Sequence, residues 1–170
     1  VRRVFQGQLG NVAVHIKVFR ADTIAAKAKK ALRTDKAERE ANHLKKVQDL
    51  GLPCVEPLGH GIAIEGDQRQ SFLVTRSITS DDFGFPASPE VANAVGRLIR
   101  RVHDASIEPL DLHPGNVLVT DQGEPLLCDL TSIRHAGELT VRKRAAGLAF
   151  FCNPIDGGPH DPQTREFRKG

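Results

Sequence analysis

The sequence predicts an α+β protein in two lobes: a small antiparallel β-sheet with one helix, then a mainly helical part. Three observations lead to this fold class. Near the start, residues alternate with the period of two typical of β-strands, whereas the segment after residue 35 has the apolar spacing of a helix. A stretch rich in Asp, Gly, Pro and Ser separates these elements from a second helical pattern. We therefore expect an N-terminal lobe over residues 1–79, a hinge or linker over 80–89 and a C-terminal lobe over 90–170.

The first lobe opens with a predicted hairpin. Residues 1–5 and 12–19 are rich in β-branched side chains and flank turn-forming residues at positions 7–11. Two more short strands, residues 60–64 and 71–75, lie on either side of a Gly-Asp pair, which again favours a turn. Together these segments predict a small sheet.

One helix should pack on this sheet. Thr34 and Asp35 are candidate N-caps, and Gly51 with Pro53 is a typical helix stop, which gives a helix of about 15 residues. The spacing of the apolar residues between them predicts its buried face: Ala37, Ala41, Leu44, Val47 and Leu50.

The second lobe should begin with another helix. Pro89 and Glu90 suit a first helical turn, and His103 lies near the expected C-terminal end, where a protonated side chain would be favourable. The apolar face of this helix consists of Val91, Val95, Leu98, Ile99 and Val102.

After this helix, a loop over residues 105–116 should lead into two short apolar strands, residues 117–120 and 126–128, which a turn at Gly123 joins. The segment 153–170 is rich in Gly and Pro, so we expect a loop there.

Composition narrows the class of protein. The 170-residue chain has a net charge of +3, with 26% charged and 39% hydrophobic residues, which is typical of a soluble globular protein. Its basic residues are scattered, so we assign them to solvated helix faces and expect no nucleic-acid partner. Cys54, Cys128 and Cys152 are odd in number and far apart, which argues against a zinc site or a disulfide framework and for a reducing compartment. No apolar run approaches the roughly 20 residues of a membrane span.

Three polar residues in the second lobe form a candidate site. Asp111 lies in the predicted loop, Asn116 follows it, and Asp129 comes directly after the second short strand. Asn116 and Asp129 offer the oxygen ligands that Mg²⁺ prefers, and the Asp111 carboxylate could accept or orient an acceptor hydroxyl. Turn formation alone would explain Asp111 and Asn116, but neither the two strands that follow nor the place of Asp129. The pattern therefore predicts Mg²⁺-dependent phosphoryl transfer from ATP.

These motifs occur in the order of the protein-kinase-like fold, which the chain resembles over roughly residues 1–150. Residues 12–17, Val-Ala-Val-His-Ile-Lys, resemble the strand whose Lys holds the α- and β-phosphates of ATP. This implies a catalytic, phosphate-contacting role for Lys17, with a Lys whose ammonium reaches solvent as the alternative. The following helix resembles the one whose Glu pairs with that Lys. Glu40 lies beside its buried face and is the expected partner, with Glu38 as the alternative.

The resemblance extends to the nucleotide-binding and catalytic segments. The hinge, whose backbone would meet the adenine edge, corresponds to Thr75, Arg76, Ser77 and Ile78. Residues 103–116 resemble the catalytic loop, with Asp111 as the catalytic residue, and Asp129 stands where the family has the Asp of Asp-Phe-Gly. His113 is expected to be structural. Arg134 is a candidate for orienting the loop or a phosphorylated acceptor, with a plain surface role as the alternative.

Among kinase-like families, the bacterial lipopolysaccharide kinases have the most similar pattern. They share Gly-Leu-Pro-x-x-x-Pro, found at residues 51–57, Arg-x-x-His-Asp-Ala at 100–105, and Asp-Leu-His-Pro-Gly-Asn at 111–116. This similarity implies transfer of the ATP γ-phosphate to a hydroxyl of a lipopolysaccharide core sugar, either heptose or 3-deoxy-manno-octulosonic acid. It also implies a cytoplasmic enzyme that associates peripherally with the inner face of the inner membrane.

The chain departs from the kinase pattern in three places. No Gly-x-Gly-x-x-Gly precedes Lys17, so we expect that the first strand with its Gly-rich loop is missing and that the C-terminal lobe is truncated. Pro109 and Leu110 replace a His-Gly pair, and residues 130–131 are Leu-Thr rather than Phe-Gly. Two alternative functions stay open: a protein serine/threonine kinase, and a nucleotide-binding pseudokinase or scaffold without turnover.

Overall fold

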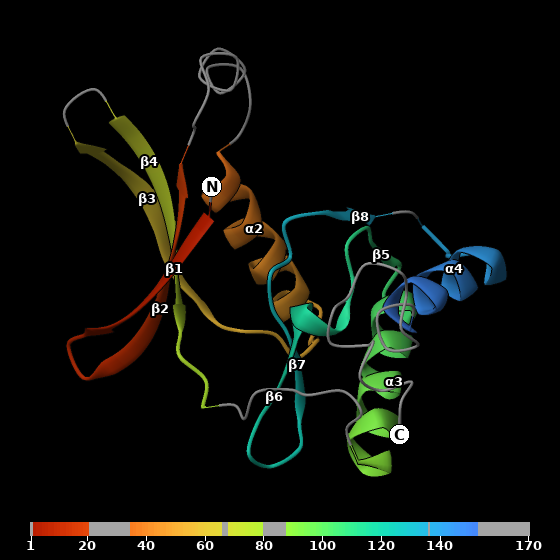
Figure 1. Ribbon diagram of the computed structural model, residues 1–170. Coiled ribbons are helices and arrows are strands. Elements are labelled where there is room, and N and C mark those ends of the chain that lie inside the picture. The colour runs from red at the N-terminus through yellow and green to blue at the C-terminus, as the bar shows by residue number, and fades with distance from the viewer. Residues whose placement is uncertain (1, 21–34, 66–67, 80–87, 136, 153–170) are drawn as a thin grey trace, which may run out of the picture. The chain divides into compact units, whose positions relative to one another are not determined.

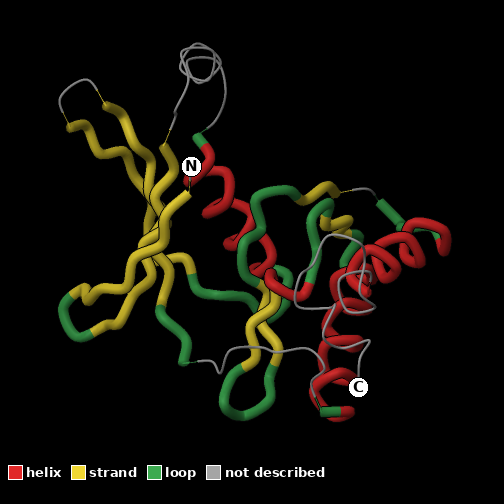
Figure 2. Tube along the Cα trace, viewed as in Figure 1, coloured by secondary structure: helices red, strands yellow, loops and turns green. Residues whose placement is uncertain are grey.

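The computed structural model describes residues 2–20, 35–65, 68–79, 88–135 and 137–152. The chain divides into two compact units, Val1–Ile78 (unit 1) and Thr79–Gly170 (unit 2). Figure 1 labels the elements of each unit, and Figure 2 distinguishes helices, strands and loops by colour. Both units combine helices with antiparallel strands, so the predicted α+β class is confirmed. No helix within the described ranges is both long enough and apolar enough to cross a membrane.

Unit 1 is built on a four-stranded antiparallel sheet with the order β1-β2-β4-β3. Its strands are β1 (Arg2–Leu9), β2 (Val12–Arg20), β3 (Pro57–Glu65) and β4 (Gln68–Arg76), which confirms all four predicted strands with wider bounds. The turn of the first hairpin is shorter than predicted, because β1 continues through Gly7 to Leu9. Gly10 has a φ of +59°, the left-handed conformation that such a two-residue turn requires.

Helix α2 (Lys36–Asp49) packs on this sheet and contacts β2, β3 and β4. Asp35 is the N-cap, as predicted, and its side chain accepts a hydrogen bond from the Ala37 N–H at 2.9 Å. At the other end, the N–H groups of Gly51 and Leu52 donate to carbonyls of the last helical turn, and Gly51 has a φ of +69°. The assignment of Leu50 to the buried face is wrong, because Leu50 is the C-cap and 48% exposed. The other four predicted positions are buried.

Helix α3 (Pro89–Asp104) contributes its apolar face to the core of unit 2. Ser88 is its N-cap and accepts a hydrogen bond from the Val91 N–H, so Ser88 and Pro89 belong to the helix and its cap rather than to the linker. The rest of the predicted linker, residues 80–87, lies outside the described residues. The buried face agrees with the prediction except at Val91, which is only partly buried, and it also includes His103.

Unit 2 also contains two pairs of short strands. The predicted pair is present as β6 (Val117–Val119) and β7 (Pro125–Leu127). A second pair joins β5 (Ile107–Pro109) to β8 (Ile133–His135), so the expectation of a loop throughout 105–116 is wrong at its start. That segment ends in a short 3₁₀ helix, η1 (Pro114–Asn116). Helix α4 (Val141–Cys152) ends the described part of the chain, and the predicted loop over 153–170 lies outside it.

His103 is a buried neutral residue rather than the predicted cation. Its side chain is 4% exposed and faces α4 so closely that a Cβ on Gly147 would lie 3.2 Å from the His103 Nε2. Burial and, to a smaller degree, the nearby Arg144 cation lower the pKa of His103, against the opposing effect of Asp104. Proximity to the helix C-terminus therefore does not keep this ring protonated.

This burial predicts acid-sensitive stability. The pKa of His103 lies below 6.5 in the folded protein, so the unfolded chain binds the proton first as the pH falls. The contribution of neutral His103 to the free energy of unfolding is therefore fully present above pH 6.5, and it is lost as the pH falls toward the folded-state pKa. The free energy of unfolding, measured with urea at about pH 7.5 and pH 5.5, should therefore differ less between the two pH values for His103→Leu than for wild type. Replacing the exposed His60 by Gln is the control, and an unchanged pH effect in His103→Leu would contradict the explanation.

Candidate active site

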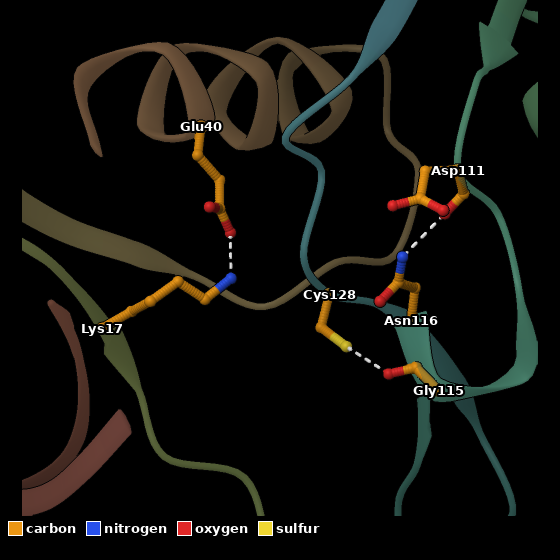
Figure 3. A network of polar contacts seen from close by, with 6 residues as sticks. All are labelled: Lys17, Glu40, Asp111, Gly115, Asn116 and Cys128. Carbon is orange, nitrogen blue, oxygen red and sulfur yellow. Dashed lines mark hydrogen bonds and ion pairs between the residues drawn. The ribbon is translucent and has the colours of Figure 1, made fainter. Parts of the chain in front are cut away.

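A buried ion pair joins β2 to α2 in unit 1. The Lys17 Nζ lies 2.6 Å from the Glu40 Oε1, and Figure 3 shows the two side chains pointing toward each other. The side chain of Glu40 is 1% exposed and that of Lys17 is 15% exposed. Glu38 is exposed on the same helix. The structure therefore pairs Lys17 with Glu40, the expected partner, and not with Glu38.

The strand register and the helix period explain this pairing. Lys17 lies opposite the buried Leu73 of β4, and cross-strand partners share one face of a sheet. Phe19 follows on the same face, with its ring centroid 5.9 Å from the Lys17 Nζ. Glu40 is one helical turn from both Ala37 and Leu44, so it belongs to the face of α2 that meets the sheet. Because a buried ion pair is seldom more stabilising than apolar packing, its presence points to a functional role.

Hydrogen bonds within unit 2 close the loop that carries Asp111. The Asn116 Nδ2 donates to the backbone carbonyl of Asp111 at 2.7 Å, and the Asn116 N–H donates to the His113 carbonyl at 2.9 Å. The His113 Nδ1 accepts from the Gly115 N–H at 3.1 Å and so caps η1, which is a structural role as expected. Leu112 is buried and anchors the loop. The side chain of Asp111 remains exposed and accessible.

The same loop is bonded to the segment that carries Asp129. The Cys128 N–H donates to the Asn116 carbonyl at 2.9 Å, and the Cys128 Sγ donates to the Gly115 carbonyl at 3.9 Å (Figure 3). Asp129 follows with a φ of +56°. This left-handed conformation is uncommon for residues other than Gly, although Asp and Asn adopt it more readily, and such strain is concentrated at functional sites. The predicted metal ligands Asn116 and Asp129 are thus brought close together.

The donor set of this segment fits Mg²⁺. The Asn116 Nδ2 is committed to Asp111, which leaves the amide oxygen Oδ1 as the ligand atom, and Asp129 supplies a carboxylate. Mg²⁺ usually takes one or two protein oxygens and completes its shell with water and substrate phosphates. Among the described residues, no group of three or more His, Cys, Asp and Glu side chains could hold a metal. The two oxygens of Asn116 and Asp129 match the small number of protein ligands that Mg²⁺ usually takes.

The predicted hinge offers fewer groups to a nucleotide than expected. Thr75 and Arg76 are the last residues of β4, and the N–H groups of Arg76 and Ser77 donate to the carbonyls of Glu56 and Ala13, each at 2.9 Å. These two amides cannot also bind an adenine, so any adenine contact by residues 75–78 must use other backbone groups.

Sequence reasoning missed the contacts that support the end of the catalytic loop. The Leu110 N–H, next to Asp111, donates to the Ser132 carbonyl at 3.0 Å and continues the β5–β8 pairing. Glu108 and Arg134 are direct partners in that pair. The strands are too short and too far apart in sequence to give a local signal.

A comparison with protein families gives an independent result. The model of the lipopolysaccharide kinase (Kdo/WaaP) family matches residues 11–146, a range that includes the ion pair, the Asp111 loop and Asp129. No curated protein matches the chain. The match spans well over half of the sequence and confirms the resemblance seen in its motifs. This chain therefore belongs to the lipopolysaccharide kinase (Kdo/WaaP) family.

Proposed function

We propose that this protein transfers the γ-phosphate of ATP to a hydroxyl of a lipopolysaccharide core sugar. Family membership supports a kinase that acts on lipopolysaccharide. The observation that carries the proposed chemistry is a pair of hydrogen bonds in unit 2. The Asn116 carbonyl accepts from the N–H of Cys128, the residue before Asp129, and the Asn116 Nδ2 donates to the Asp111 carbonyl. This arrangement supports a site in which Asn116 and Asp129 would supply oxygen ligands and Asp111 an exposed carboxylate.

Each proposed role follows from the chemistry of the group. Catalysis of phosphoryl transfer depends mainly on positioning and on neutralising charge. The Asp111 carboxylate would orient the acceptor hydroxyl and accept its proton. Lys17, oriented by Glu40, would contact the α- and β-phosphates. Asn116 and Asp129 would hold Mg²⁺, which when bound offsets the negative charge of the phosphates.

We extend the proposal to the fold and the compartment. Unit 1, with its sheet, its single described helix and the Lys17–Glu40 pair, would be the N-terminal lobe of a protein-kinase-like fold, and unit 2 the C-terminal lobe. Residues 75–78 would be the hinge. We place the reaction in the cytoplasm at the inner face of the inner membrane, with peripheral association, since three cysteines that are not in disulfides suit a reducing compartment.

Transfer of label from [γ-³²P]ATP to isolated core oligosaccharide tests the proposal. We expect Mg²⁺-dependent labelling of the oligosaccharide, and Asp111→Asn should reduce its rate about 10²- to 10⁴-fold. Asp121→Asn is the matched control, because Asp121 is an exposed Asp in the β6–β7 turn. Label on protein alone would support a serine/threonine kinase instead. ATP binding without transfer to any acceptor would support a pseudokinase.

A further inference from the structure

We infer that Arg134 and Lys143, here called the basic pair, bind an anionic group of the acceptor; this inference rests on the proposed function. Both cations approach one oxygen, the Oε2 of Glu108. The Lys143 Nζ lies 3.0 Å from it, and the Arg134 Nη1 lies 3.8 Å from it. Because both distances end at the same atom, the two cationic groups are close together. Arg134 comes from β8, Glu108 from β5 and Lys143 from α4.

The charges of Glu108, Arg134 and Lys143 do not balance. One carboxylate faces two cations, so the cluster keeps a net positive charge. Glu108 is mostly covered, with 22% of its side chain exposed, whereas the side chains of Arg134 and Lys143 are 61% and 43% exposed. The excess positive charge is therefore presented to solvent on groups that can turn toward a ligand.

The strand that carries Arg134 is bonded to the segment that precedes the proposed catalytic residue. Arg134 is two residues from Ser132, whose carbonyl accepts from the Leu110 N–H, and Leu110 is the residue before Asp111. Two residues of extended chain span about 7 Å. One backbone hydrogen bond and this short stretch of strand thus connect Arg134 to the residue before Asp111, so an acceptor with an anionic substituent could contact both.

The position of Lys143 within α4 does not favour a cation. Its N–H donates to the Thr140 Oγ1, which puts Lys143 in the first turn of α4, and this turn contains no acidic residue. A cation there is unfavourable, because the helix N-terminus already carries a partial positive charge. The flanking Arg142 adds like charge, whereas Arg144 is paired with Asp104. A bound anion would remove this cost.

The chemistry of the pair suits a carboxylate or a phosphate. A guanidinium offers a planar fork of donors and an ammonium offers a mobile point charge, and both groups recognise either anion. The two sources of the anion are thus a carboxylate sugar acid and a phosphorylated neutral sugar.

Calorimetry without ATP tests the inference separately from catalysis. The probes are 3-deoxy-manno-octulosonic acid, its uncharged methyl ester and heptose phosphate. We expect Arg134→Gln and Lys143→Gln each to weaken binding of the preferred anionic probe about three- to tenfold, and Glu108→Gln to tighten it. Arg100→Gln is the matched control, because Arg100 is also an exposed Arg that faces a carboxylate, Asp104, shared with a second cation.

The outcomes separate the inference from its alternatives. Preference for the acid over its ester indicates a carboxylate acceptor, and preference for heptose phosphate a phosphorylated one; both support the inference. Binding that is independent of charge, no binding of either anion, or variants that behave like Arg100→Gln would overturn it. So would variants that lose binding only to phosphatidylglycerol vesicles, which would indicate a membrane contact. Wild-type protein that binds the anionic sugar but transfers no phosphate would refute the proposed function alone.

Discussion

Replacing Asp129 by Asn should abolish Mg²⁺-dependent ATP binding, with a loss of affinity of more than about a hundredfold. The physical reason is charge, because the carboxylate is the anionic member of the proposed metal site. Asn is the informative replacement. Residue 129 has a φ of +56°, a conformation that Asn adopts more readily than Ala, so Asp129→Asn keeps the backbone and removes the charge.

Asp111→Asn should give the contrasting result, in which ATP still binds and turnover is lost. It is the backbone carbonyl of Asp111, not its side chain, that accepts the hydrogen bond from Asn116. The loop should therefore stay closed in this variant. Only the exposed carboxylate that would orient and deprotonate the acceptor is removed.

Titration calorimetry with Mg²⁺·ATP separates these roles. Wild type and Asp111→Asn should bind with similar affinity, and EDTA should suppress binding in both. Asp129→Asn should not bind. Asp121→Asn controls for the loss of one Asp at an exposed turn of the same unit. Equal loss of binding in the Asp111 and Asp129 variants would show that the roles are wrongly assigned.

The features that could be predicted from the sequence are those set by neighbouring residues. The hairpin and α2 follow from local periodicity and from caps such as Asp35 and Gly51. Even the choice of Glu40 over Glu38 follows from helical spacing, because only Glu40 lies one turn from the buried Leu44. The Asp111, Asn116 and Asp129 motif was recognisable because its spacing suits two short strands.

The remaining features depend on partners that are distant in sequence. β5 and β8 are three residues each and are strands only because they pair with each other. Two N–H groups of the predicted hinge, those of Arg76 and Ser77, donate to the carbonyls of Glu56 and Ala13, which no local pattern indicates. Helix α4 was not predicted, because its apolar residues do not keep to one face and Gly147 interrupts them. The left-handed backbone of Asp129 has no sequence signal beyond the identity of the residue.

Lys17→Met should both destabilise the protein and abolish phosphoryl transfer. The substitution takes the cation away from a carboxylate that is 1% exposed, and breaking a buried ion pair in this way typically costs about 3 to 5 kcal/mol of unfolding free energy. Lys45→Met is the matched control. Lys45 pairs with Asp49 on the surface of α2, with side chains 69% and 61% exposed, so its loss should cost less than about 0.5 kcal/mol.

A double variant separates the structural from the catalytic part of this effect. Lys17→Met with Glu40→Leu removes both charges from the core of unit 1 and should recover most of the lost stability, because apolar packing can replace a buried ion pair. Phosphoryl transfer should not recover, because the proposed phosphate contact is still missing. Urea unfolding and the labelling assay, run on the same samples, measure the two effects. Recovery of activity together with stability would mean that the pair serves folding alone, and the role of Lys17 in catalysis would have to be abandoned.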